Sequence, residues 1–411
     1  MKKFIAITFC CLLMAVSSDI FACTSAIISG RVTPDGRPLL WKHRDTDAAQ
    51  NLVRYFQGDK YAFSAIAQTN NPNPRSVWMG VNEAGFAIMN TMSYNIEPTE
   101  NEENADNNGY IMKLALGNCA DAEEFEALLN SLEKPWLISS NLGVIDAKGN
   151  AYYYEVNNNE YIRFDVNDPA TAPLGYIVRS NFSFAGDTER GSGYVRYMHA
   201  DEIVKAGVMH NAMTPEFIFN ELSRSFENPL IGVDLKSGDF NRPKTTGWFV
   251  EQDFIARYTT TSSVVVQGVR EGEAVELTTM WTVVSYPPTT VAMPVWVCGG
   301  EEGIPYILSQ NEEGRSTLGN MGYMMKEKAY AHEIEKSRKT RYFNWELLWN
   351  LQGDGYMQLV QQIEKELFRE YNSAIESWRN EGTVNHREMK KLHDKWSTYI
   401  VEKYYEYFGM K

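Results

Sequence analysis

The chain has 411 residues, of which 44% are hydrophobic, 13% aromatic and 22% charged. This composition is typical of a globular protein with a large core, and it excludes a disordered or collagen-like chain. The 39 lysines and arginines against 53 aspartates and glutamates give a net charge of −14. Nucleic-acid-binding proteins carry a basic patch, so we expect no nucleic-acid partner.

The first 22 residues have the features of a secretory signal peptide. Lys2 and Lys3 precede an apolar run at residues 4–16, which is shorter than the roughly 20 residues that a membrane-spanning helix needs. The run is followed by a short segment that ends in Ala22, a small residue suited to signal-peptidase cleavage. We therefore expect cleavage after Ala22, no later membrane span, and a mature protein that is periplasmic or secreted.

Cleavage after Ala22 would make Cys23 the first residue of the mature chain. The mature chain would also keep Cys119 and Cys298, which could pair with each other. Cys23 would then be an unpaired thiol in an oxidising compartment. A cysteine at the amino terminus carries its thiol next to a free α-amine, and such an amine can act as the base for the nucleophile. The sequence therefore predicts an N-terminal nucleophile at Cys23.

Two other interpretations of Cys23 stay open. In a lipoprotein, Cys23 would carry diacylglycerol and anchor a ligand-binding protein that has no chemistry of its own. Against this, Phe21 is bulky for a lipidation signal, and residues 24–28 include β-branched side chains typical of a strand rather than of a loose tether. Cys23 could also be an incidental cysteine.

The segment after Cys23 predicts a β-hairpin. A Pro-Asp-Gly turn signal lies at residues 34–36, and a second apolar strand follows at 38–41. The returning strand would bring Arg44 and Asp47 beside Cys23. A cation there favours the thiolate, and the carboxylate of Asp47 could orient the α-ammonium. An exposed ion pair is the alternative interpretation of these two residues.

The rest of the chain predicts groups of strands with helices between them. We expect helices at 110–116, 122–129 (with Asp121 as its N-cap) and 213–226. We expect strands at 142–146, 151–156, 161–166, 245–251, 259–269, 276–284 and 290–297. This pattern predicts an α+β fold of two stacked antiparallel sheets covered by helices. Aromatic residues at helical spacing after residue 324 are typical of packing faces.

Four separated motifs resemble those of the N-terminal nucleophile hydrolases. The groups that they resemble most are choloylglycine hydrolases with penicillin V acylases, and acyltransferases of the isopenicillin-N and 6-aminopenicillanate type. The motifs are the Cys-Thr start with Arg44 and Asp47, residues 78–87, residues 178–182 and residues 280–288. The resemblance implies a four-layer αββα sandwich at residues 23–300, after the signal peptide 1–22 and before a mainly helical extension at 301–411.

The resemblance also implies further site residues. Asn181 would donate a hydrogen bond from its side-chain amide to the oxyanion of the tetrahedral intermediate. Asn90 lies near the place where the bile-salt enzymes carry an asparagine, with a strand-end asparagine as the alternative interpretation. Those enzymes also have a distal arginine, for which Arg196 is preferred to Arg190, with a surface-helix arginine as the alternative interpretation. Asn82 is expected to form a turn.

The expected activity is that of an exported N-terminal cysteine amidohydrolase or acyltransferase. It would cleave the C–N bond of a small-molecule N-acyl amide through a thioester, and a dipeptidase of the same fold is the alternative. No cofactor is expected, and no metal either, because the six histidines do not pair at metal-ligand spacing. The C-terminal helices could form a contact in a homo-oligomer.

Overall fold

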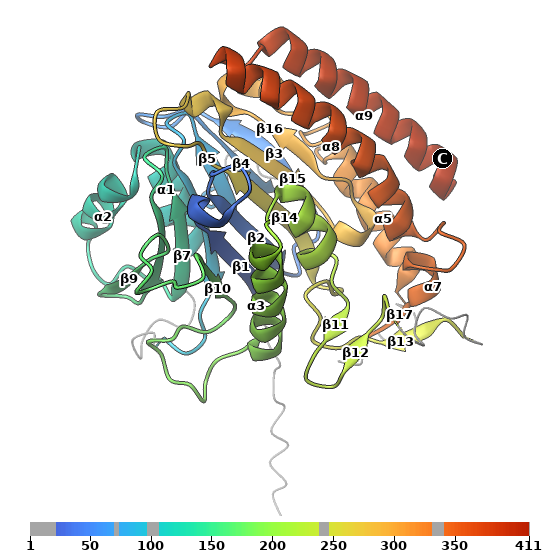
Figure 1. The fold of residues 1–411 in the computed structure, drawn as a ribbon, viewed down its shortest axis with the longest axis horizontal. Helices are drawn as coiled ribbons and strands as arrows, with labels where there is room; N and C mark the ends of the chain where they lie inside the picture. The colour runs from blue at the N-terminus through green and yellow to red at the C-terminus, as the bar shows by residue number, and fades with distance from the viewer. Residues whose placement is uncertain (1–21, 70–73, 97–106, 238–245, 331–340, 411) are drawn as a thin grey trace, which may run out of the picture.

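Two antiparallel sheets form the centre of the molecule (Figure 1). The computed structural model describes residues 22–69, 74–96, 107–237, 246–330 and 341–410. The expected signal peptide therefore lies outside the described residues, apart from Ala22. None of the described helices is long and apolar enough to cross a membrane.

The first sheet has the amino-terminal hairpin among its inner strands. In spatial order its strands are β10 (Tyr176–Arg179), β1 (Cys23–Ile28), β2 (Leu39–Asp45), β14 (Thr260–Gln267), β15 (Thr279–Val283) and β16 (Met293–Val295). β1 runs antiparallel to both of its neighbours, and Cys23 lies opposite Arg44 in the register with β2. The predicted hairpin is therefore confirmed, including the return of Arg44 to the start of β1.

The second sheet is a meander, in which each strand pairs with the next one along the chain. Its strands are β3 (Asn51–Phe56), β4 (Phe63–Gln68), β5 (Met79–Asn82), β6 (Ala87–Met92), β7 (Ser140–Ile145), β8 (Ala151–Val156) and β9 (Tyr161–Asp165). Two short ribbons lie outside both sheets. They pair β11 (Glu227–Asn228) with β12 (Val233–Asp234), and β13 (Trp248–Val250) with β17 (Tyr342–Asn344).

The inner faces of the two sheets pack against each other in one hydrophobic core. The sheets come close together at Gly143 in β7. A Cβ atom at this position would lie 2.3 Å from Met89 Cε, 3.1 Å from Ile27 Cδ1 and 3.2 Å from Leu40 Cδ1. A side chain at 143 would displace the end of Met89 and press on Ile27 and Leu40, so glycine allows β7 to approach β1 and β2 closely.

Helices cover the outer faces of both sheets, which gives the four layers αββα (Figure 1). α1 (Asn108–Asn118) and α2 (Ala122–Ser131) cover the second sheet, with Asp121 as the N-cap of α2. The remaining helices are α3 (Tyr194–Met209), α4 (Pro215–Phe217), α5 (Thr317–Ala329), α7 (Trp345–Leu348), α8 (Tyr356–Glu381) and α9 (His386–Phe408). The predicted α+β fold and the cap at Asp121 are confirmed.

The C-terminal helices pack on the outside of the first sheet, where α8 lies between the sheet and α9 (Figure 1). The ring of Trp281 in β15 stacks on Phe368 in α8, with centroids 4.4 Å apart. A buried ion pair adds to this contact, since Arg224 Nη1 and Nη2 donate to the two carboxylate oxygens of Glu364 at 2.7 and 2.6 Å. Glu364 also accepts a hydrogen bond from the backbone nitrogen of Ala292.

Two sequence predictions differ from the structure. The helix expected at 213–226 is shorter and consists of α4 and a π-helical turn at Ile218–Leu222. Conversely, α3 was not predicted, because its buried face includes Arg196 and His199 and therefore lacks a clear apolar repeat.

The ion pair between Arg224 and Glu364 yields a stability prediction. Glu364→Ala should lower the free energy of unfolding by about 3–5 kcal/mol, because it leaves a buried guanidinium without its carboxylate. The control is Glu366→Ala, which removes an exposed ion pair with Arg369 and should cost less than about 1 kcal/mol. Urea unfolding of both variants measures the difference, and equal losses would contradict the expectation.

Candidate active site around Cys23

Cys23 lies at the first position of β1 and lines a cavity of about 260 Å³. The Cys23 residue is only 8% exposed. The cavity is lined by polar and apolar groups from β2, β6 and the segments around them. They are Lys42, Arg44, Asp45, Thr46, Asp47, Ala48, Gln68, Trp78, Asn90, Met92, Asn108 and Gly109. The structure thus brings four of the predicted residues, Cys23, Arg44, Asp47 and Asn90, to one cavity.

The backbone nitrogen of Cys23 is held by a side chain from the neighbouring strand end. It donates to Asn181 Oδ1 at 2.8 Å, and Asn181 follows β10. Ala22 still precedes Cys23 here, and its carbonyl oxygen accepts from the backbone nitrogen of Asp45 at 2.8 Å. The nitrogen that cleavage would convert into an α-amine therefore already has a specific acceptor.

Asn181 makes its contacts with both ends of its side-chain amide. Its Oδ1 accepts from Cys23 and also from Arg196 Nη2 at 3.0 Å. Its Nδ2 donates to the carbonyl oxygen of Met92 at 2.8 Å. The contact with the Cys23 nitrogen that we expected from Asp47 is thus made by Asn181.

Arg196, in the first turn of α3, joins several groups of the site. Its Nη1 donates to the carbonyl oxygen of Cys23 at 2.7 Å and to Thr24 Oγ1 at 2.8 Å. Its Nε donates to Asp253 Oδ1 at 3.1 Å. The guanidinium is 99% buried, and burial lowers the pKa of Arg196 from its ordinary value. Of the two arginines considered from the sequence, Arg196 is thus the one that contacts Cys23 and Asn181, and Arg190 is exposed.

Arg44 lies opposite Cys23, and its guanidinium is stacked over Trp78 at 4.1 Å from the ring centroid. Among the described residues its side-chain hydrogen bonds go to neutral groups, Thr261 Oγ1 at 3.2 Å and Asn51 Oδ1 at 3.4 Å. Burial lowers the pKa of Arg44 to about 10, although the charges of Cys23 and Asp47 act in the opposite direction. Arg44 therefore stays a cation near neutral pH.

Asp47 and Asn90 also line the cavity. Asp47 is exposed, and its Oδ1 accepts from Thr46 Oγ1 at 3.2 Å. Asn90 is buried in β6, where Oδ1 accepts from Lys42 Nζ at 2.7 Å and Nδ2 donates to Ser140 Oγ at 3.0 Å. Asn90 therefore positions a cation at the cavity wall.

A network of charged side chains around the buried carboxylate of Asp45 supports the strand end that carries Arg44. Arg257 Nε and Nη2 donate to Asp45 Oδ2 at 2.8 and 2.7 Å, and its Nη1 donates to Asp253 Oδ1 at 2.6 Å. Burial lowers the pKa of Arg257, but Asp45 and Asp253 outweigh this effect, so that the pKa is raised. Since Asp253 also accepts from Arg196, it is shared by two arginines.

Sequence reasoning missed Lys42, which is only 4% exposed and also donates to the carbonyl oxygen of Trp78 at 2.7 Å. A signal for it was present, because Lys42 lies two residues before Arg44 and a strand places such residues on the same face. Asn82 has the expected role as a turn former, since its Oδ1 accepts from the backbone nitrogens of Ala84 and Phe86.

The three described cysteines are all free thiols. Cys119 belongs to the core under α1 and α2, whereas Cys298 lies against the other core, near the C-terminal helices. The pairing of Cys119 with Cys298, which the sequence left open, is therefore absent from the structure.

No family model and no curated protein matches the chain. Similar solved structures include a conjugated bile acid hydrolase from Clostridium perfringens, which is 12% identical with a TM-score of 0.39; the match covers 67% of this chain and 93% of that one. An N-acylethanolamine-hydrolyzing acid amidase ortholog from Caenorhabditis elegans is 14% identical, with a TM-score of 0.37 and coverage of 59% and 92%. Penicillin V acylase from Agrobacterium tumefaciens is 14% identical, with a TM-score of 0.34 and coverage of 67% and 85%.

Proposed function

We propose that the chain is an exported N-terminal cysteine amidohydrolase that cleaves the C–N bond of a small-molecule N-acyl amide. The observation that carries the proposal is that the structure holds the nitrogen of Cys23 at a specific acceptor and also places the residue at a cavity. Its nitrogen faces Asn181 Oδ1 at 2.8 Å, while the residue lines a cavity together with Arg44. Removal of residues 1–22 would turn this nitrogen into an α-amine beside its own thiol, which is the arrangement of a nucleophile with its base.

In the proposed reaction Cys23 Sγ attacks the carbonyl carbon of the amide, and the α-amine takes the thiol proton. The C–N bond then breaks, and the α-ammonium returns the proton to the leaving amine. The product is a thioester between Cys23 and the acyl group. Water attacks this thioester, loses a proton to the α-amine, and releases the acid and the thiol. An acyltransferase would differ only in that an amine replaces water in this second step.

The side chains around Cys23 have distinct proposed roles. Arg44 favours the thiolate, because its side-chain hydrogen bonds within the described part of the chain go to the neutral groups of Thr261 and Asn51, which leave its positive charge uncompensated by a bonded carboxylate there. Asn181 Oδ1 accepts a hydrogen bond from the α-amine. Since an amide nitrogen carries two N–H donors, the same side chain could also serve the oxyanion beside its bond to Met92.

The surroundings of Cys23 do not favour the alternative of a lipid anchor. A lipidated cysteine lies at the end of a tether that reaches the membrane. Cys23 is instead 8% exposed, and it belongs to a strand that is paired on both sides within a sheet. A diacylglyceryl group on its sulfur would have to occupy the cavity.

The first functional prediction concerns processing and the nucleophile. The exported protein should begin at Cys23 with an unmodified amine, and Cys23→Ser should abolish release of amine from an N-acyl amide panel while the fold is kept. Intact mass, N-terminal sequencing and the amine assay measure these outcomes. Cys119→Ala is the matched thiol control and should keep its turnover, because Cys119 lies in a separate core. A diacylglyceryl mass increment on active protein, or full turnover by Cys23→Ser, would contradict the proposal.

The second prediction separates the two possible uses of Asn181. Asn181→Ala should lower kcat by about a hundredfold or more if the amide donates to the oxyanion. KM should change little, because this contact strengthens in the transition state. Asn181→Asp keeps an acceptor for the α-amine but loses the donor, so it should be impaired to a similar extent. Near-normal kcat in Asn181→Asp would restrict the role of Asn181 to holding the amine.

The third prediction concerns Arg196 as a positioning residue. Arg196→Lys cannot serve both Cys23 O and Asn181 Oδ1 as the guanidinium does, so it should lower the free energy of unfolding by about 1–3 kcal/mol because a buried acceptor loses its donor. It should also lower kcat of the folded protein with little change in KM. Arg190→Lys is the control at an exposed position and should change stability by less than about 0.5 kcal/mol. Unchanged kcat in folded Arg196→Lys would limit the residue to a structural role.

A further inference from the structure

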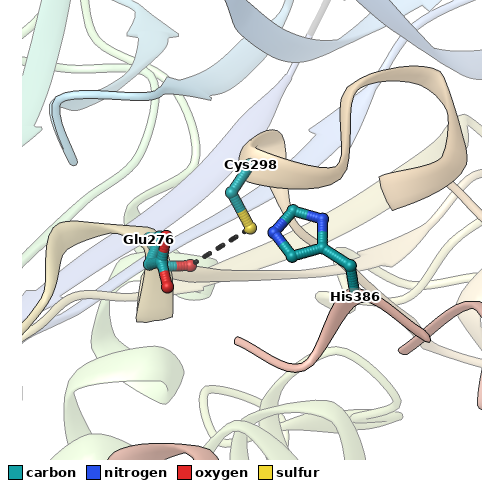
Figure 2. A group of neighbouring side chains, drawn as sticks. All are labelled: Glu276, Cys298 and His386. Atoms are coloured by element: carbon teal, nitrogen blue, oxygen red, sulfur yellow. Dashed lines mark hydrogen bonds between the residues drawn. The ribbon is translucent and has the colours of Figure 1, made fainter. Parts of the chain in front are cut away.

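A second group of reactive side chains lies away from the Cys23 cavity. Glu276, Cys298 and His386 each offer one donor atom, and these atoms lie within 4.8 Å of one another. Figure 2 shows Cys298 Sγ between Glu276 and the imidazole ring of His386. The three residues come from separate segments, namely the turn at Val275–Leu277, the turn at Val297–Gly303 and the first position of α9.

The three donors form a set that suits zinc. Thiolate sulfur, imidazole nitrogen and carboxylate oxygen are the protein ligands of Zn²⁺, and they bind it at about 2.0–2.3 Å. In a tetrahedral site with these bond lengths the ligand atoms lie about 3.3–3.8 Å apart. The three donor atoms lie within 4.8 Å of one another, so small side-chain rotations would bring them to one ion. We propose that Glu276, Cys298 and His386 bind one zinc ion, with a water molecule as the fourth ligand.

The surrounding contacts hold these side chains in place. Glu276 Oε1 accepts from Thr383 Oγ1 at 2.6 Å and from the backbone nitrogen of Val384 at 2.8 Å. These bonds fix the segment that leads into α9 and so keep His386 beside Glu276. His386 itself is exposed, so its ring can rotate toward a metal ion without disturbing the core. Cys298 is a free, half-buried thiol, and its Sγ makes a long contact of 3.8 Å with the carbonyl oxygen of Glu276.

The position of the site assigns it a structural role. Glu276 lies in the short helical turn that leads into β15, Cys298 lies in the turn that follows β16, and His386 begins the outermost helix. A zinc ion at this point would tie α9 directly to the edge of the first sheet. None of the three residues lines the Cys23 cavity, so loss of the zinc should lower stability more than it lowers turnover. The proposal is thus independent of the proposed hydrolase activity.

The test is a cobalt titration of the purified full chain. Co²⁺ bound to a thiolate gives a near-ultraviolet charge-transfer band, which an oxygen and nitrogen site does not give. The band therefore reports directly whether Cys298 Sγ is a ligand of the bound metal. We expect one equivalent of Co²⁺, a band in wild type and in Cys23→Ser, and no band in Cys298→Ser. Added Zn²⁺ should remove the band.

His386→Asn is the second variant, because an exposed side chain can be changed without loss of the fold. It should weaken Co²⁺ and Zn²⁺ binding by about tenfold or more, and Zn²⁺ should raise its melting temperature less than that of wild type. Persistence of the band in Cys298→Ser, or equal metal binding by His386→Asn, would overturn the proposal. Cobalt binding without a charge-transfer band would overturn it as well, since it would point to the thiol-free group His199, Glu202 and Glu227.

Discussion

The pairing of β1 with β2 is the constraint on which the site depends. Both are inner strands, and the antiparallel register sets Cys23 opposite Arg44. A slip of one residue would turn every side chain of the strand to the other face of the sheet, which would remove Cys23 from the cavity and expose Ile27 to the helix side. The packing of Ile27 and Leu40 against Gly143 makes such a slip costly. The core between the sheets therefore also fixes the geometry of the reactive end.

Local patterns in the sequence were sufficient for the fold class and for the residues closest to Cys23. The turn signal at 34–36 and the apolar residues on either side determine the hairpin, so the position of Arg44 follows from counting along two strands. The cap at Asp121 and the strands of the second sheet after residue 140 are likewise local features. Asn181 was found through the motif at 178–182, and its side chain does contact Cys23.

The remaining features depend on contacts between distant segments. Asp253 is shared by Arg196 and Arg257, but nothing near residue 253 indicates which helix and which strand will meet there. The same holds for the proposed zinc ligands, whose three segments come together only when α9 packs on the first sheet. Helix α3 was missed because it buries arginine and histidine. Such polar faces are stabilised by specific partners rather than by an apolar repeat.

The burial of Ala22 has a consequence for the timing of maturation. Ala22 is 3% exposed, and its carbonyl oxygen is bonded to the backbone of Asp45, so the bond between Ala22 and Cys23 is inside the folded protein. Proteases cut exposed and mobile backbone. A separate protease would therefore reach this bond only before the segment folds. While the bond is intact, the nitrogen of Cys23 is an amide and cannot accept a proton, so a folded chain that keeps Ala22 should lack the proposed activity.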